Sequence, residues 1–213
     1  MSVIKPETPR EEVANAITHG MGVVLSIVGL LALLYREDPD FHSLKTASFS
    51  IFGGSMIVLY LASTCYHAFF RNPRLYRFFQ LMDHSAIYVL IAGTYTPFSL
   101  VALKGEQGVV MFFSIWALAV LGVIFKLFFI GKFKKLSLMM YLGMGWLGMA
   151  YYNELMTALE LEGFSLILIG GLFYTLGTIF YIWEKLPFNH AIWHLFVMGG
   201  SASLYFCIYF YVW

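Results

Sequence analysis

The stretch that decides the fold is VVMFFSIWALAVLGVIFKLFFI, residues 109–130, in which Lys126 is the single charged residue. A helix of about 20 apolar residues crosses the roughly 30 Å hydrocarbon core of a bilayer. Because lipid offers no hydrogen bonds to a bare backbone, each crossing must be a helix or part of a closed barrel. The apolar residues here are continuous rather than alternating, and this favours a transmembrane helix.

Six further runs of the same character predict a polytopic, all-α membrane protein. Of the 213 residues, 60% are hydrophobic and 12% are charged, far from the balance of soluble proteins. We predict transmembrane spans at about residues 16–34, 46–70, 79–103, 109–130, 136–159, 163–183 and 189–212. The connections are short, so residues 1–213 are expected to form a single seven-transmembrane helix bundle. The first run begins with polar residues and lacks a basic leader, which favours a retained helix over a signal peptide.

The basic residues predict the orientation through the positive-inside rule. With seven spans, the N-terminal segment and the connections after spans 2, 4 and 6 lie on one side. The ten basic residues of that side are Lys5, Arg10, Arg71, Arg74, Arg77, Lys126, Lys132, Lys134, Lys135 and Lys185, against Arg36, Lys45 and Lys104 on the other. We therefore predict a cytoplasmic N terminus and an outside C terminus. A net charge of +1 gives no indication of a nucleic-acid partner.

Four ionisable side chains fall inside the predicted spans at one shared depth. His67 ends span 2, Asp83 lies near the start of span 3, and His190 and His194 open span 7. All four are expected roughly 5–10 Å inside the cytoplasmic face of the bilayer. Intramembrane ionisable groups cost a few kcal/mol each unless they have partners, so their common depth indicates a site.

The spacing of the histidines favours a metal ion. His190 and His194 are four residues apart and share one helix face, as do Ser63 and His67. Three imidazoles with a fourth position left to water or a carboxylate is an arrangement typical of catalytic zinc. Histidines that only pack, and a b-type haem held between two histidines, are the alternatives for this pattern.

A catalytic base is not supplied by the histidine pair itself. Residue 191 is Ala, so the segment HAIWH is not an HExxH motif. Asp83 would have to act as the base, or accept a hydrogen bond from a metal-bound water. Ser63 is a candidate to orient that water or to stabilise an oxyanion. His84 follows Asp83 and points about 100° away on a helix, so it is not expected to be a ligand.

A second polar stripe opens the first span. Glu11, Asn15 and His19 are spaced by four residues, and Glu12 is an alternative acid. One interpretation is an interfacial helix start, where Glu is favoured near the positive end of the helix dipole. The other is a group of residues that orients the metal ligands or closes the cytoplasmic mouth of the bundle.

Taken together, these motifs resemble the haemolysin III family. They are EEVANAITHG at 11–20, Ser-x₃-His ending span 2, DHSAIYVLIAGTYTPF at 83–98, and His-x₃-His opening span 7. That family is the bacterial branch of the progestin and adipoQ receptors, which include the adiponectin receptors. The resemblance covers essentially the whole chain. It implies a multi-pass protein of the bacterial plasma membrane, with an N-terminus inside, and zinc on His67, His190 and His194.

The resemblance also implies a function class. It places Asp83 and Ser63 close to a metal-bound water, and it connects the chain to the alkaline ceramidases, which are zinc-dependent intramembrane amidases. Our leading hypothesis is therefore a zinc-dependent hydrolase of a lipid acyl amide or ester, with a membrane lipid or fatty acyl substrate. The alternatives are a membrane sensor or regulator with structural zinc, and a cytolytic pore. A homo-oligomer is compatible with each of these three functions.

Overall fold

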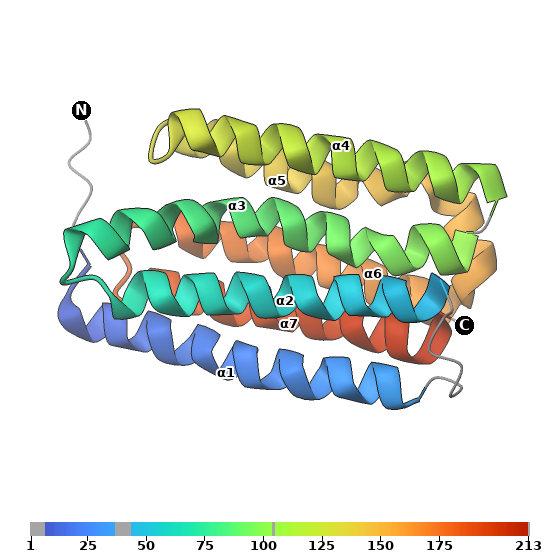
Figure 1. Ribbon diagram of the computed structural model, residues 1–213, viewed down its shortest axis with the longest axis horizontal. Coiled ribbons are helices and arrows are strands. Elements are labelled where there is room, and N and C mark those ends of the chain that lie inside the picture. The colour runs from blue at the N-terminus through green and yellow to red at the C-terminus, as the bar shows by residue number, and fades with distance from the viewer. Residues whose placement is uncertain (1–6, 37–43, 104, 213) are drawn as a thin grey trace.

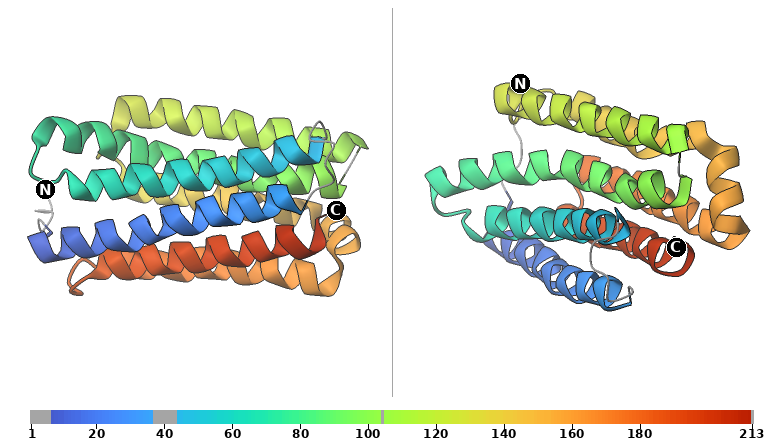
Figure 2. Two further views of the ribbon diagram at one scale, coloured as in Figure 1. Left: turned by 60° about the horizontal axis from the view of Figure 1, so that its bottom comes forward. Right: turned by 45° about the vertical axis from the view of Figure 1, so that its right-hand side comes forward.

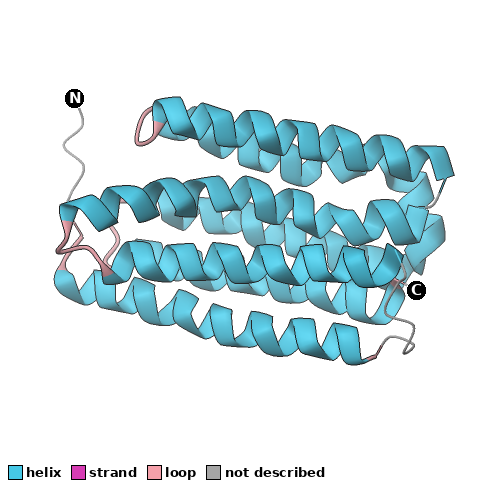
Figure 3. Cartoon of the chain, in the orientation of Figure 1, coloured by secondary structure: helices cyan, strands magenta, loops and turns pink. Residues whose placement is uncertain are grey.

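The computed structural model describes residues 7–36, 44–103 and 105–212, and these residues are helical apart from short connections (Figure 3). Two members of the charge count, Lys5 and Lys104, lie outside them. The elements are α1 (Pro9–Tyr35), α2 (Leu44–Ala68), α3 (Pro73–Pro97), the π-helical η1 (Phe98–Leu103), α4 (Gly105–Phe129), α5 (Lys134–Trp146), the 3₁₀-helical η2 (Leu147–Tyr151), α6 (Tyr152–Ile182) and α7 (Asn189–Tyr211).

Six helical stretches in the described part of the chain are long and apolar enough to cross a membrane. Their outward faces carry large apolar side chains, such as Val24 and Leu25 on α1 and Phe113 on α4, as lipid contact requires. The prediction of an all-α, multi-pass membrane protein is confirmed.

One of the six stretches is too long for a single crossing. Lys134–Ile182 covers 49 residues, which as one straight helix would measure about 73 Å. Glu160, with φ 58° and ψ 178°, breaks the helical path. After α5 the chain turns back at the end of the bundle opposite the start of α1 (Figure 2). The break lies at the boundary expected between residues 159 and 163. The count of seven crossings stays a prediction.

The start of α1 and the end of α7 lie at opposite ends of the bundle (Figure 1). An odd number of passes gives this arrangement. Which end faces the cytoplasm stays a prediction of the charge count. The end that holds the start of α1 also holds the end of α2, the start of α3 and the start of α7, and this places the predicted site residues together.

Two apolar clusters hold the helices to one another. The larger one joins α1, α2, α3, α6 and α7 and includes Leu33, Phe52 and Ile208. The smaller one packs α4 and α5 against the outer side of α3 and includes Tyr88 and Met111. Helices α4 and α5 therefore form a separate layer beside α3, as Figure 1 shows.

Candidate metal centre

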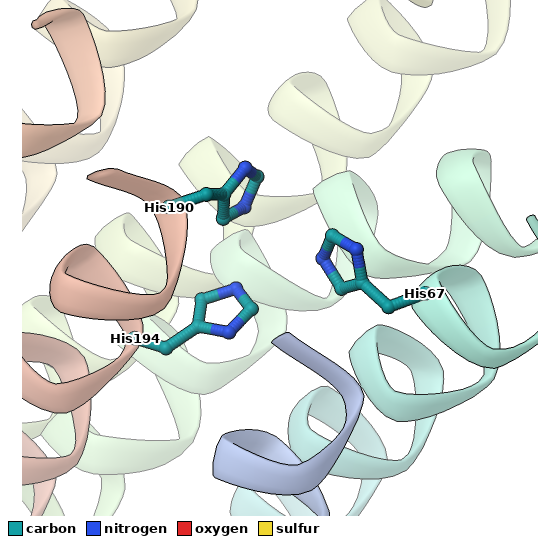
Figure 4. A group of neighbouring side chains, drawn as sticks. All are labelled: His67, His190 and His194. Carbon is teal, nitrogen blue, oxygen red and sulfur yellow. The ribbon is translucent and has the colours of Figure 1, made fainter. Parts of the chain in front are cut away.

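Three histidines from two helices meet at the end of the bundle where α1 begins. Donor atoms of His67 on α2 and of His190 and His194 on α7 all lie within 4.8 Å of one another. Their ring centroids are separated by 4.7 to 5.1 Å. Figure 4 shows the three rings directed into the same space. The two helices thus present a compact set of nitrogen ligands.

The start of α7 is fixed by a contact with α1. Phe188, directly before α7, has a φ of 55°, an uncommon left-handed conformation for a residue other than glycine. Its backbone N–H donates to Oε1 of Glu11 at 3.1 Å. This hydrogen bond holds the turn that precedes His190, so α1 helps to set the position of the α7 histidines.

Each of the three histidines has an oxygen partner at its Nδ1 atom, and every one of these partners comes from the N-terminal part of the chain. The pairs are His67 with Oε2 of Glu12 at 2.7 Å, His190 with Oε1 of Glu7 at 2.9 Å, and His194 with Oγ1 of Thr18 at 3.1 Å. Such partners fix the ring orientation and the tautomer of metal-binding histidines. With Nδ1 engaged, Nε2 is the ring nitrogen that remains for a metal ion.

The test of whether a metal fits rests on a buried nitrogen. Nε2 of His67 is buried and has no hydrogen-bond partner among the described residues. A buried polar atom without a partner costs about 1–3 kcal/mol, so such atoms call for a ligand. A cation coordinated by three neutral imidazoles would satisfy this nitrogen. The donor set is the one that zinc prefers.

Asp83 and Ser63 lie beside the histidines. Asp83, on α3, lines the same cavity as His190 and His194. Its Oδ2 lies 3.8 Å from Nδ1 of His84, the next residue on α3. Ser63 precedes His67 by one turn, and its buried Oγ has no hydrogen-bond partner among the described residues. The structure therefore brings an acid and an unpaired hydroxyl to the imidazole cluster.

The four polar residues of the α1 stripe take different places. Glu12 bonds to His67, and Nδ2 of Asn15 donates to Glu7 and lies 3.5 Å from Nδ1 of His67. His19 stacks on the ring of His194, with centroids 3.5 Å apart. Glu11 instead forms a reciprocal capping box with Thr8. Glu11 therefore caps the start of α1, whereas the other three residues of the stripe contact the histidines.

Glu7 and Thr18 are the site residues that sequence reasoning missed. The predicted span began at about residue 16, so Glu7 was left in a connection. The sequence Thr8-Pro9-Arg10-Glu11 carries a signal that could have found it, since S/T-x-x-E with Pro at the first helical position marks a helix start. A helix that begins at Pro9 places Glu7 directly at the mouth of the site.

The cluster opens into a cavity of about 190 Å³ inside the bundle. One part of its wall carries His19, Asp83, His190 and His194. The larger part is apolar, and includes Leu59, Leu90, Phe98, Phe164 and Val197. The cavity can therefore hold an extended apolar group whose polar end meets the histidines.

The comparisons with known proteins agree with this architecture. The model of the haemolysin-III related family matches residues 8–205. The chain belongs to this family. It is 50% identical to Hemolysin-3 of Bacillus cereus, over 95% of this chain and 92% of the relative, and 50% identical to the Hemolysin-3 homolog of Bacillus subtilis, over 96% and 95%.

A more distant relative comes from animals. The human monocyte to macrophage differentiation factor is 32% identical over 95% of this chain and 84% of that protein. This relative lies in the progestin and adipoQ receptor family, so the resemblance drawn from the sequence motifs is confirmed. No solved structure matches the chain.

Proposed function

We propose that His67, His190 and His194 bind a zinc ion through their Nε2 atoms. The observation that carries this proposal is that each Nδ1 is already paired with Glu12, Glu7 or Thr18, while Nε2 of His67 is buried without a partner. Burial of two of the three rings supports it, since His67 is 2% and His194 is 1% exposed.

We further propose that the site hydrolyses an acyl amide or ester bond of a membrane lipid near the cytoplasmic leaflet. When bound, zinc would lower the pKa of a water molecule and polarise a carbonyl. Asp83 accepts a proton from the attacking water and returns it to the leaving amine or alcohol. The new bond joins the water oxygen to the carbonyl carbon, and the C–N or C–O bond breaks. The unpaired hydroxyl of Ser63 orients the water.

The apolar wall of the cavity supports a lipid substrate. The acyl chain would lie against Leu90, Phe98 and Phe164, with its carbonyl at the histidines. The cavity removes this chain from water and holds the carbonyl close to Asp83, and such positioning contributes a large part of catalysis in general.

The test uses purified wild type, Asp83→Asn and the matched control Glu106→Gln, an exposed residue in the first turn of α4. Zinc per chain and fatty acid released from a total lipid extract are measured together. We expect zinc in all three, release by wild type and Glu106→Gln, and a loss of about 100-fold or more in Asp83→Asn. Full zinc with no release from any lipid fraction would contradict the hydrolase and favour a sensor with structural zinc.

The names of the bacterial relatives keep a cytolytic function as the second candidate. Hemolysin-3 of Bacillus cereus carries that activity in its name. A pore predicts dye leakage from liposomes that contain the purified protein. Leakage that persists in His190→Ala, with no fatty acid release by wild type, would support the pore over the enzyme.

A further inference from the structure

A buried lysine lines the same cavity as His190 and His194. Lys126 lies in the last turn of α4 and is 2% exposed. Its Nζ donates to Oγ of Ser137 on α5 at 2.6 Å and lies 5.5 Å from the ring centroid of Tyr141. The charge count placed this residue on the predicted cytoplasmic side, near the end of span 4. The structure adds that its side chain is buried in the protein.

Burying the ammonium group of Lys126 costs free energy. A lysine near a helix end normally extends its ammonium group to the interface, where water solvates it. A cation inside the bundle costs several kcal/mol unless an anion compensates it. Among the described residues, no carboxylate forms an ion pair with Lys126, and a hydroxyl is the hydrogen-bond partner of its Nζ.

The unused donors of Lys126 lie beside the cavity that holds the histidines. An ammonium group has three N–H donors, and Ser137 accepts one of them. Lys126, Ser137, Asp83 and His190 all line this cavity. Among the described residues, Asp83 is paired with the neighbouring His84 at 3.8 Å, and it forms no ion pair with Lys126.

The neighbouring wall carries two more lysines. Lys132, in the connection between α4 and α5, and Lys134, at the start of α5, also line the cavity, and Lys134 is paired with Glu184 at 3.9 Å. The remaining wall is mostly apolar. A ligand that matches this wall has an acyl chain and one anionic group.

We propose that Lys126 binds the anionic group of the acyl lipid, a carboxylate or a phosphate. This rests on the proposed lipid substrate, and it narrows that substrate to an anionic lipid. Ser137, whose hydroxyl donates to the Phe133 carbonyl at 3.2 Å, holds the ammonium group in place. Binding the anion supplies the counter-charge that the buried ammonium lacks, and it sets the distance between the anionic group and the histidines. A neutral lipid of the same chain length leaves the ammonium uncompensated.

The experiment measures ligand selectivity rather than hydrolysis. Purified full-length protein in non-ionic detergent is offered oleate against oleyl alcohol, and oleoyl lysophosphatidate against mono-oleoylglycerol. Bound ligand is counted by native mass spectrometry. We expect the wild type to prefer one anionic member over its neutral partner about tenfold or more, since loss of one partner of a buried charge pair is costly. The stronger of the two anionic ligands identifies carboxylate or phosphate.

Three variants test the residue itself. Lys126→Met keeps the bulk of the stem and is expected to lose the preference, whereas Lys126→Arg is expected to keep at least half of it. Lys135→Met makes the same change at an exposed residue that does not line the cavity and is expected to match the wild type. Equal zinc content across the set shows that the histidine site is intact.

Unchanged selectivity in Lys126→Met would overturn the proposal and leave Lys126 as a tie between α4 and α5. If Lys126→Met does not fold, equal binding of anionic and neutral ligands by the wild type overturns it as well. Selective binding without fatty acid release would contradict the hydrolase alone, so failure of one proposal is distinguishable from failure of the other.

Discussion

The two ends of the bundle use the same helices in different ways. At the end where α1 begins, the buried faces of α2 and α7 carry His67 and His194. At the other end the same faces carry Phe52 on α2 and Cys207 and Ile208 on α7, all at most 1% exposed. The helices continue without a break, so the change lies in the side chains alone.

Hydrogen bonding separates the two ends further. Buried side-chain atoms without a partner among the described residues belong to Asn15, His19, Ser63, His67 and Ser85, which come from the half of the bundle that holds the histidines. At the far end Oγ of Ser48 donates to the Leu44 carbonyl and Oγ of Ser203 to the Leu166 carbonyl. Buried polar groups are normally paired. One end is thus completed by its own contacts, whereas the other leaves buried polar atoms unpaired among the described residues, as the proposed metal site needs.

The largest expected effect comes from removing one histidine of the candidate metal centre. His67→Ala and His190→Ala each remove one of three ligands, and zinc is expected to fall from about one per chain to below about 0.1, since structural zinc sites contribute about 10–16 kcal/mol through the full ligand set. Metal analysis of the purified proteins measures it. Loss of zinc in both variants would show that α2 and α7 contribute to one site. Full zinc in either variant would show that the remaining residues, such as Glu7 and Glu12, hold the ion without that histidine.

The next largest effect comes from removing a buried ring at the apolar end of the bundle. Phe52→Ala removes a ring that is 1% exposed in the larger apolar cluster, and is expected to cost about 3–5 kcal/mol of folding free energy. Thermal unfolding in detergent measures the loss, and metal analysis at low temperature is expected to give the wild-type zinc content. A variant that loses zinc while still folded would show that the two ends are not independent.

The sequence predicts well the helices and the grouping of the site residues at one end of the bundle. The expected spans 109–130 and 189–212 correspond to α4, Gly105–Phe129, and α7, Asn189–Tyr211. Continuous apolar runs determine these elements, because the bilayer allows little else. The depth argument grouped His67 with His190 and His194 from charge and topology, and the structure brings their rings together.

The sequence could not predict the partners across helices. Periodicity gives the face of a residue on its own helix, but not the neighbour of that face. Glu7 and His190 are 183 positions apart, and Lys126 turns inward because Ser137 of α5 stands beside α4. Both contacts depend on how helices pack side by side. The spacing of residues along one helix does not specify that packing. The oxygen partners of the histidines and the inward direction of Lys126 are therefore seen only in the structure.

A smaller effect separates the two acids at the start of α1. Glu12→Gln weakens the acceptor at Nδ1 of His67 and is expected to lower zinc affinity about 10–100-fold. Glu11→Gln is the matched comparison, because Glu11 caps α1 and accepts from Phe188 and so acts on the histidines only through the position of α7. Its main effect is expected on stability, at about 1 kcal/mol, with a smaller loss of zinc affinity than in Glu12→Gln. Zinc affinity is measured by competition with a chelator. Equal affinity losses in both variants would contradict the different places given to these neighbours.

The smallest effect tests the boundary between the two ends. Tyr60 lies on α2 between Phe52 and His67, and its hydroxyl donates to Oγ of Ser201 on α7 at 2.8 Å. Tyr60→Phe removes this bond and is expected to cost about 0.6 kcal/mol, the average for hydrogen bonds between membrane helices, because Tyr174 still reaches Ser201 at 2.9 Å. The ring that packs against His19 is kept, so zinc affinity should stay within about twofold of the wild type. A tenfold loss of zinc affinity would show that the hydrogen bonds in the middle of the bundle hold the histidine end in place, because the ring itself is unchanged.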